Sequence, residues 1–249
     1  MSHSEENANC AGFDNTHWSI VLTAAHASTI SSREALGKLC NIYWYPLYCY
    51  IRRCGHDATE AEDLAQEFFT YLIENYGLRG VKHEHSRFRS YLLAALNHFL
   101  SNERDRSRTK KRGGGRKILN LDGATAEQRY ARELIDSATP EKIFDRQWAL
   151  TLLEVCMSRL RQDYADLGKS AVFEKLKEQL TSSRKETGYA EIASQLHMTE
   201  GAVKVAALRF RRRYRELIRD EISQTVSSAQ EMEDEIQHLF DYASRIAAR

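Results

Sequence analysis

The sequence predicts an all-α protein. Apolar residues recur along most of the chain at the three- and four-residue spacing of amphipathic helices. Only 2 of the 249 residues are proline and 12 are glycine, the two residues that interrupt helices most strongly. No stretch shows the convincing alternation of a β-strand. We therefore expect two small helical modules joined by a flexible linker, the C-terminal one containing a helix-turn-helix.

The predicted domain organisation follows changes in composition along the chain. It comprises an N-terminal tail (residues 1–16), an N-terminal module (17–112), a linker (113–138), a C-terminal module (139–222) and an acidic extension (223–249). Three consecutive glycines open the linker, which is polar and contains one expected short helix, around Gln128 to Leu134.

Three helices are predicted in the N-terminal module. The first begins at the capping box Ser31–Glu34, and Pro46 is expected to kink or split it. The second begins at the capping box Thr59–Glu62. The third runs from about Phe88 into a basic block. Each has an apolar line at helical spacing, so the three helices can share one core.

The C-terminal module begins at Thr139-Pro140, a cap followed by proline in the first helical turn. Apolar residues from Ile143 to Leu160 then predict a long helix. Further along, Tyr189–Leu196 predicts a short helix and His197-Met198 a turn. Thr199 is a suitable N-cap for a second helix. This pattern is typical of a helix-turn-helix, whose second helix enters the major groove of DNA.

The second helix of this motif is strongly basic, although the formal net charge of the chain is only +1. The residues expected near base edges are Thr199, Glu200 and Lys204, with Ala207 or Leu208 as a further candidate. The residues expected at phosphates are Arg209, Arg211, Arg212 and Arg215. A solvated amphipathic helix is the alternative. Because the acid-free run follows a complete turn motif, DNA binding is favoured.

An acidic surface is predicted on the helix within residues 57–74. Its polar residues recur at helical spacing: Asp63, Gln66, Glu67 and Thr70. An acidic face repels DNA and suits contact with a protein. Taken alone, such a face is more often simply solvated.

The order of these parts resembles an extracytoplasmic-function (ECF) sigma factor of bacterial RNA polymerase. DLAQEFF (63–69) is similar to the family's DLxQExF motif. FRSYLLAALNHFLSNERDRSR (88–108) resembles its helix for the minus-ten element, and YAEIASQLHMTEGAVKVAALRFRRRYREL (189–217) its module for the minus-thirty-five element. The likeness covers roughly residues 17–222 and is strongest to the large, planctomycete-type branch. Leu208 departs from the family, which often has a polar residue there.

The resemblance implies a subunit that binds RNA polymerase core and directs promoter recognition and transcription initiation. It implies contact with the coiled coil of the largest core subunit through Asp63, Gln66, Glu67 and Thr70, contact with the flap, and an anti-sigma protein as a further partner. On the middle helix it implies DNA contacts by Arg87, Arg89, Tyr91, Asn97, His98, Asn102, Arg104, Arg106, Arg108 and Lys110. Rings and cations together suit a displaced single strand.

Other functional classes are less well supported. A transcriptional regulator that acts without polymerase shares the helix-turn-helix and is the alternative. A nuclease built on Asp63 and the triplet at 83–85 would lack both paired carboxylates with matching ligands and a phosphate-binding loop. A purely structural helical adaptor leaves the basic helix unexplained. We expect no catalysis and no cofactor.

The remaining composition bounds the setting of the protein. The 5 cysteines include no CxxC pair, so no disulfide framework is expected. Neither Cys49, Cys54 and His56 nor the triplet at 83–85 fits a closed zinc site, and no metal is expected. No run is long and apolar enough for a membrane span, and the first residues do not form a signal peptide. We therefore expect a cytoplasmic protein with no membrane contact.

The acidic extension is predicted to contain an amphipathic helix. Its apolar stripe comprises Met232, Ile236, Leu239, Phe240 and Ala243. Two roles are open for this helix. It packs against the C-terminal module, or it lies near the DNA-binding face of the free protein and competes with promoter DNA.

Overall fold

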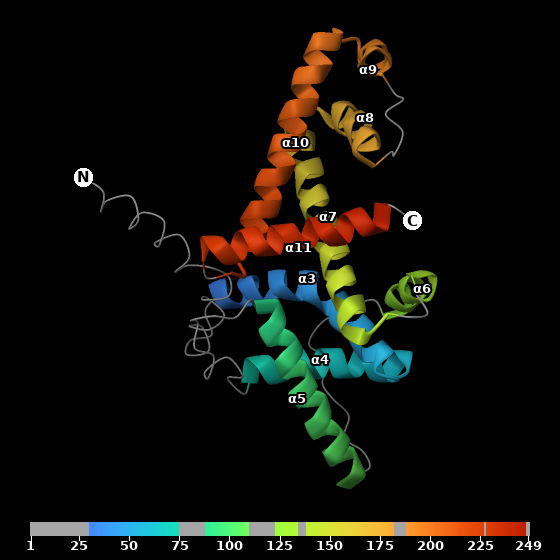
Figure 1. Cartoon of the computed structure of the whole chain (residues 1–249), viewed down its shortest axis with the longest axis vertical. Coiled ribbons are helices and arrows are strands. Elements are labelled where there is room, and N and C mark those ends of the chain that lie inside the picture. The colour runs from blue at the N-terminus through green and yellow to red at the C-terminus, as the bar shows by residue number, and fades with distance from the viewer. Residues whose placement is uncertain are drawn as a thin grey trace, which may run out of the picture. The chain divides into compact units, whose positions relative to one another are not determined.

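The computed structural model describes residues 30–74, 88–109, 123–133, 138–181, 188–226 and 228–247. Every regular element in those ranges is an α-helix, which confirms the all-α prediction (Figure 1). In chain order the helices are α3 (Ile30–Arg53), α4 (Ala58–Glu74), α5 (Phe88–Thr109), α6 (Gly123–Glu133), α7 (Pro140–Asp166), α8 (Ser170–Thr181), α9 (Tyr189–Gln195), α10 (Glu200–Ser223) and α11 (Ala229–Ala247).

The chain divides into two compact units. Unit 1 comprises Met1–Thr151 and Ile222–Tyr242, and unit 2 comprises Leu152–Glu221 and Ala243–Arg249. The helices α7, α10 and α11 supply residues to both units. The division therefore differs from the predicted modules, because the start of α7 and most of α11 are grouped with the N-terminal helices.

The core of unit 1 is built from large aromatic and aliphatic side chains. α3 packs against α4, and α4 packs against α5 and α6. The largest fully buried side chains of the unit are Tyr43, Leu47, Tyr48, Ile51, Phe68, Leu92, Leu96, Phe144 and Trp148. An edge-to-face contact between Tyr43 and Phe88, with ring centroids 5.1 Å apart, joins α3 to α5.

The starts of the helices follow local capping chemistry. α4 begins at Ala58, where the Glu60 N–H donates to the Asp57 carboxylate at 2.8 Å. The predicted cap, Thr59, is therefore two residues too late, because Asp57 is an equally good N-cap that comes earlier. The side chains of the box Ser31–Glu34 lie outside the described residues.

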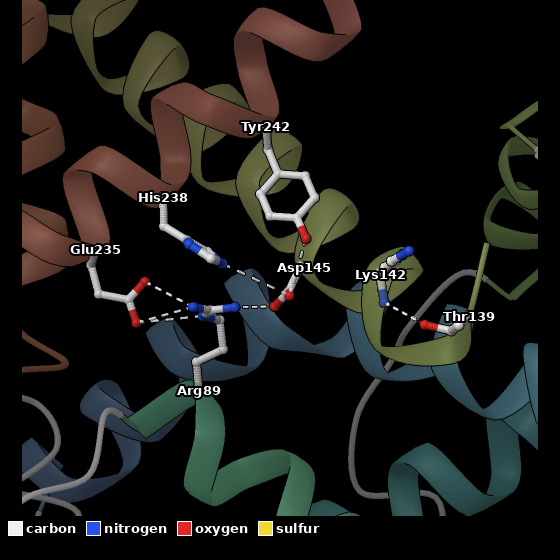
Figure 2. A network of polar contacts seen from close by, with 7 residues as sticks. All are labelled: Arg89, Thr139, Lys142, Asp145, Glu235, His238 and Tyr242. Carbon is white, nitrogen blue, oxygen red and sulfur yellow. Dashed lines mark hydrogen bonds and ion pairs between the residues drawn. The ribbon is translucent and has the colours of Figure 1, made fainter.

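Two prolines have contrasting outcomes. Pro140 is the first residue of α7, as predicted, and the Lys142 N–H donates to the Thr139 hydroxyl at 3.4 Å (Figure 2). Pro46 lies inside α3, which continues through it, so of the two predicted outcomes, a kink or a split, the split is wrong. Pro46 is buried together with its aromatic neighbours Trp44, Tyr45 and Tyr48. We infer that packing of these rings stabilises the helix despite its missing hydrogen bond.

The segment predicted as a linker contains α6, which packs on unit 1. Arg52 of α3 donates to both carboxylate oxygens of Glu127, at 3.0 and 2.7 Å. Tyr48 donates its hydroxyl to the same carboxylate. The Arg52 guanidinium also lies 5.1 Å from the ring centroid of Tyr130. α6 is therefore part of the folded unit rather than a spacer.

α11 presents a different buried face from the predicted one. Leu239 is buried as expected, but Phe240 is exposed and Glu235 is buried instead. Met232 and Ile236 are half-buried. Because residues up to Tyr242 are grouped with unit 1, α11 completes that unit rather than the core of the C-terminal module.

Unit 2 has its own aromatic centre. Tyr164 of α7, Phe173 of α8 and Phe210 of α10 lie with their ring centroids 5.5 to 6.1 Å apart. Tyr214 donates its hydroxyl to the Leu153 carbonyl at 3.1 Å. These contacts fix α10 against α7 and α8, and so determine which face of α10 points outward.

Within the described ranges, none of the helices combines the length and the hydropathy that crossing a membrane requires. The same ranges hold no group of three or more His, Cys, Asp or Glu side chains arranged for a metal ion. Cys40, Cys49 and Cys156 are buried.

Candidate nucleic-acid interface

The helices α9 and α10 pack through a small apolar core. Ile192 and Ala193 of α9 and Val203 of α10 are buried together. Leu196 and Met198, from the connecting turn, pack against them. Because Ala193 and Val203 are small, the two helices can approach closely, as in a helix-turn-helix.

The turn between these helices is tight and well defined. His197 has a φ of 51°, in the left-handed region that few non-glycine residues adopt. The Met198 N–H donates to the Ala193 carbonyl at 2.9 Å, which closes the end of α9. Thr199 then caps α10, since its hydroxyl accepts the Ala202 N–H at 3.2 Å. Thr199 is thus a structural residue in addition to a predicted DNA contact.

The inward face of α10 belongs to the core of unit 2. Val203, Ala207, Phe210 and Leu217 are buried on it. Ala207 therefore cannot contact bases, and that part of the prediction is wrong. Leu208, the other candidate, is 66% exposed and lies on the opposite face. The difference follows from the rotation of about 100° per residue in a helix.

The outward face of α10 presents most of the predicted basic residues. Lys204, Arg209, Arg212 and Arg215 are exposed, whereas Arg211 is half-buried and donates to the Tyr189 hydroxyl at 3.4 Å. In a recognition helix the N-terminal turns contact base edges and the later turns pass phosphates. The first turns of α10 expose polar groups, and its later turns expose arginines.

Several of these cations have acidic neighbours at the surface. Lys204 lies 2.7 Å from Glu200, whose hydrogen bond raises the pKa of Lys204. Arg212 lies 3.0 Å from Glu216. Arg213 pairs with Asp163 of α7 at 2.8 Å. Exposed pairs of this kind contribute only about 0–1 kcal/mol, so an incoming phosphate can replace the carboxylate at low cost.

A hollow of ≈ 940 Å³ lies beside the start of α10, between that helix and the end of α7. Its lining includes Leu167, Met198 and Val205 together with charged residues at its edge, among them Asp163 and Arg209. It is an open surface depression with no catalytic grouping in its lining.

The predicted DNA contacts on α5 fall into three groups. Asn97, His98, Asn102 and Arg104 are exposed. Tyr91 is half-buried, and burial raises its pKa to about 12. Arg106 and Arg108 lie in α5, but their side chains are outside the described part of the structure. Arg87 and Lys110 lie outside it entirely. A DNA strand could reach the four exposed residues, although Asn97 already accepts a hydrogen bond from the Tyr50 hydroxyl at 2.7 Å.

Arg89 is buried and does not lie at the surface, contrary to the prediction. Its guanidinium donates to Asp145 of α7 and, at 3.2 to 3.4 Å, to both oxygens of Glu235 of α11 (Figure 2). It also lies 4.8 Å from the ring centroid of Trp148. Burial alone would lower the pKa of Arg89, but the Glu235 and Asp145 carboxylates outweigh it and raise the pKa.

The partners of Arg89 are residues that sequence reasoning missed. Glu235 lies between Met232 and Leu239 on the apolar side of α11, three and four residues from them. An acid in that position signals a buried ion pair, and this pattern could have been noticed. Nothing in the sequence identifies Arg89 as its partner, 146 residues away.

The predicted acidic face of α4 is only partly exposed. Asp63 is exposed, Glu67 and Thr70 are half-buried, and Gln66 is only 8% exposed. Burial, followed by the nearby Glu103 and Asp63 charges, raises the pKa of Glu67. The prediction that Gln66 is presented on the surface is wrong, because both Phe68 and Phe69 are buried and widen the packed side of α4.

Comparison with known proteins adds no relative to this picture, since no family model, curated protein or solved structure matches the chain.

Proposed function

We propose that this protein is a sigma factor of the ECF type. It binds the core of bacterial RNA polymerase in the cytoplasm and directs promoter recognition and transcription initiation, with no catalysis of its own. The observation that supports this most is the outward face of α10, where Lys204, Arg209, Arg212 and Arg215 are exposed directly after a tight turn.

In the proposed DNA binding, basic side chains of α10 exchange weak surface ion pairs for contacts with phosphates. Every phosphate that an arginine neutralises releases condensed counterions, which favours binding at moderate salt. The acidic neighbours of Lys204 and Arg212 are on the same helix, Glu200 exposed and Glu216 half-buried, so they hold these cations in place without strongly competing for them.

The polymerase contact is proposed for α4. The motif DLAQEFF supports it, together with the exposure of Asp63 and the half-buried Glu67. In this proposal the coiled coil of the largest core subunit supplies the opposite charge. Gln66 takes part only as a buried support for α4.

The decisive experiment is reconstitution with purified core polymerase. The full chain should co-elute with the core enzyme in gel filtration, and the complex should select duplexes from a randomised DNA pool. Transcription from the selected duplexes should depend on this protein. Failure to bind core polymerase would overturn the proposal.

Two substitutions test the division of roles along α10. Lys204→Ala should relax sequence preference, because its position near the start of the helix is that of a base contact. Arg212→Ala should weaken binding to all sequences alike and lower the salt slope by about one unit. The measurement is binding to a panel of selected and scrambled duplexes over a range of salt concentrations. A change of preferred sequence in Arg212→Ala would contradict these roles.

A helix-turn-helix regulator that acts without polymerase is the second candidate. The burial of Gln66 favours it, since it reduces the surface that α4 offers to a partner. Such a regulator would bind its selected DNA with full affinity in the absence of core polymerase, and adding core would leave transcription from that DNA unchanged.

A further inference from the structure

Two apolar side chains stand on the outward face of α10. Leu208 is 66% exposed and Val205 is 48% exposed. They lie three residues apart, so they are neighbours on the helix surface. The core of unit 2 does not use them, because Val203, Ala207 and Phe210 supply the buried face of the same turns.

The surroundings of this pair carry a net positive charge, because the exposed cations Lys204, Arg209, Arg212 and Arg215 outnumber the nearby acids Glu200 and Glu216. Lys204 lies one turn before Leu208, and Arg212 lies one turn after it. Both cations are exposed on the same face. A ligand that binds this face therefore needs negative charge opposite the cations and an apolar group that can contact Leu208 and Val205.

Duplex DNA has this combination in its major groove. Phosphates line the groove, and the one apolar group on its floor is the 5-methyl group of thymine. A leucine or valine cannot hydrogen-bond a base edge, so contact with that methyl group is the direct contribution to sequence recognition open to either side chain.

We infer that Leu208 and Val205 select thymine by packing against its 5-methyl group in the major groove. This inference rests on the proposed binding of promoter DNA by α10. Leu208 is the principal contact, since it is the more exposed and lies between Lys204 and Arg212.

The hollow beside α10 borders this pair on the side of Val205. Its lining includes Val205 and Leu167 but not Leu208. Leu167 is 65% exposed and lies in the loop after α7, outside the recognition helix. Leu167 therefore provides a matched control: an equally exposed leucine of unit 2 that the inference does not place on a base.

The test uses duplexes selected from a randomised pool by the complex of the full chain with core polymerase. Each thymidine of a selected duplex is replaced in turn by deoxyuridine, which removes only the 5-methyl group. At one or two positions the wild-type complex should bind about fourfold more weakly, the ratio that corresponds to one buried methyl group of ~0.8 kcal/mol.

The variants show which side chain contacts that thymine methyl group. Leu208→Ala should bind the thymidine and deoxyuridine duplexes equally at the sensitive position, whereas Leu167→Ala should keep the fourfold difference. Replacing the sensitive thymine pair by a 5-methylcytosine pair should retain part of the affinity. Since Leu208 is exposed, its truncation should leave the circular dichroism and melting temperature unchanged.

The outcomes separate the inference from the proposed function. Selected duplexes that bind with equal affinity after every uridine replacement would overturn the inference and leave the sigma-factor proposal standing. Retention of the fourfold difference by Leu208→Ala and by Val205→Ala alike would overturn it too, because a group outside this pair would then contact the methyl. If no duplex is selected at all, both fail together.

Discussion

The guanidinium of Arg89 lies between carboxylates that are 56 and 146 residues away in the chain. It joins α5, α7 and α11 of unit 1 (Figure 2). Tyr242 and His238 also approach Asp145, at 3.3 and 4.0 Å. Replacing a buried ion pair by apolar groups is often harmless, but removing one partner leaves an uncompensated buried charge.

Arg89→Ala should therefore lower the free energy of unfolding of unit 1 by about 3–5 kcal/mol. Both tryptophans in the described part of the structure, Trp44 and Trp148, are buried in unit 1, so urea unfolding followed by tryptophan fluorescence reports on that unit. Arg104→Ala, on the exposed part of the same helix, should change the value by less than about 0.5 kcal/mol. Equal losses for the two variants would contradict a structural role of Arg89.

The sequence predicts those features of the helices that depend on residues close together in the chain. The helix-turn-helix was foreseeable because its determinants, from Tyr189 to Thr199, are neighbours in sequence and act through capping and turn geometry. The role of Arg89 was not, because its charge and helical position are the same for a DNA contact and for a buried ion pair. Only the distant partners Asp145 and Glu235 distinguish the two.

Among the helices, α6 illustrates how a polar segment becomes part of a folded unit. A short helix was predicted around Gln128 to Leu134, whereas α6 already begins at Gly123. Its docking depends on Arg52 and Tyr48 of α3, more than 70 residues away. The pKa of Glu127 lies below its ordinary 4.5, chiefly because Arg52 donates hydrogen bonds to the charged carboxylate. Docking of α6 should therefore depend on pH.

The Glu127 carboxylate has a lowered pKa in the folded state. Its contribution to stability is fully present above pH 4.5 and is lost as the pH falls through the folded pKa. Glu127→Gln should accordingly melt at a lower temperature than wild type near pH 6, and the gap should close in acid. Gln128→Ala, exposed on the same helix, should leave the gap to wild type constant with pH. A gap for Glu127→Gln that does not change between pH 6 and pH 3 would disprove this role.

α4 is the element proposed to bind polymerase. Asp63→Arg together with Glu67→Arg should abolish core binding, because it places like charges across the proposed contact. The fold should persist, since Asp63 is exposed and an arginine at position 67 would face Glu103. Gel filtration with core polymerase measures the effect. Glu233→Arg with Asp241→Arg makes the same charge change on α11 and should still bind.

Unaltered core affinity in the α4 double variant would remove the docking assignment. Gln66 is only 8% exposed, whereas Asp63 is exposed and Glu67 half-buried, so the double variant changes the two acids that α4 presents at its surface.

In the whole molecule, the two compact units do not correspond to two continuous stretches of chain. Unit 1 includes Ile222–Tyr242, which follows all of Leu152–Glu221 of unit 2. Composition could not reveal this arrangement, because the acidic extension differs from the rest of unit 1 and its partners are distant. Helical periodicity predicted α11, and only the packing of Glu235 and Leu239 shows where it belongs.

Deleting residues 228–249 should lower the urea midpoint of the tryptophan transition, because it exposes Arg89 and Asp145 and removes Leu239 from the core. A chain that ends at Tyr242 keeps Glu235, Leu239 and the Tyr242–Asp145 contact, so its midpoint should equal that of wild type. If the longer deletion leaves the midpoint unchanged but strengthens binding of free protein to selected DNA, α11 is a competitor of DNA rather than a packing helix.

The position of α11 in the chain also sets an order of events during translation. About 70 residues separate Thr151 from the second segment of unit 1. At 5–20 residues per second, the ribosome needs roughly 4–14 s to synthesise them. Throughout that interval the nascent chain has Arg89 and Asp145 but no Glu235, while the Leu152–Glu221 segment of unit 2 is completed. The N-terminal unit, although it is begun first, is the one whose folding must wait for the later part of the chain to emerge.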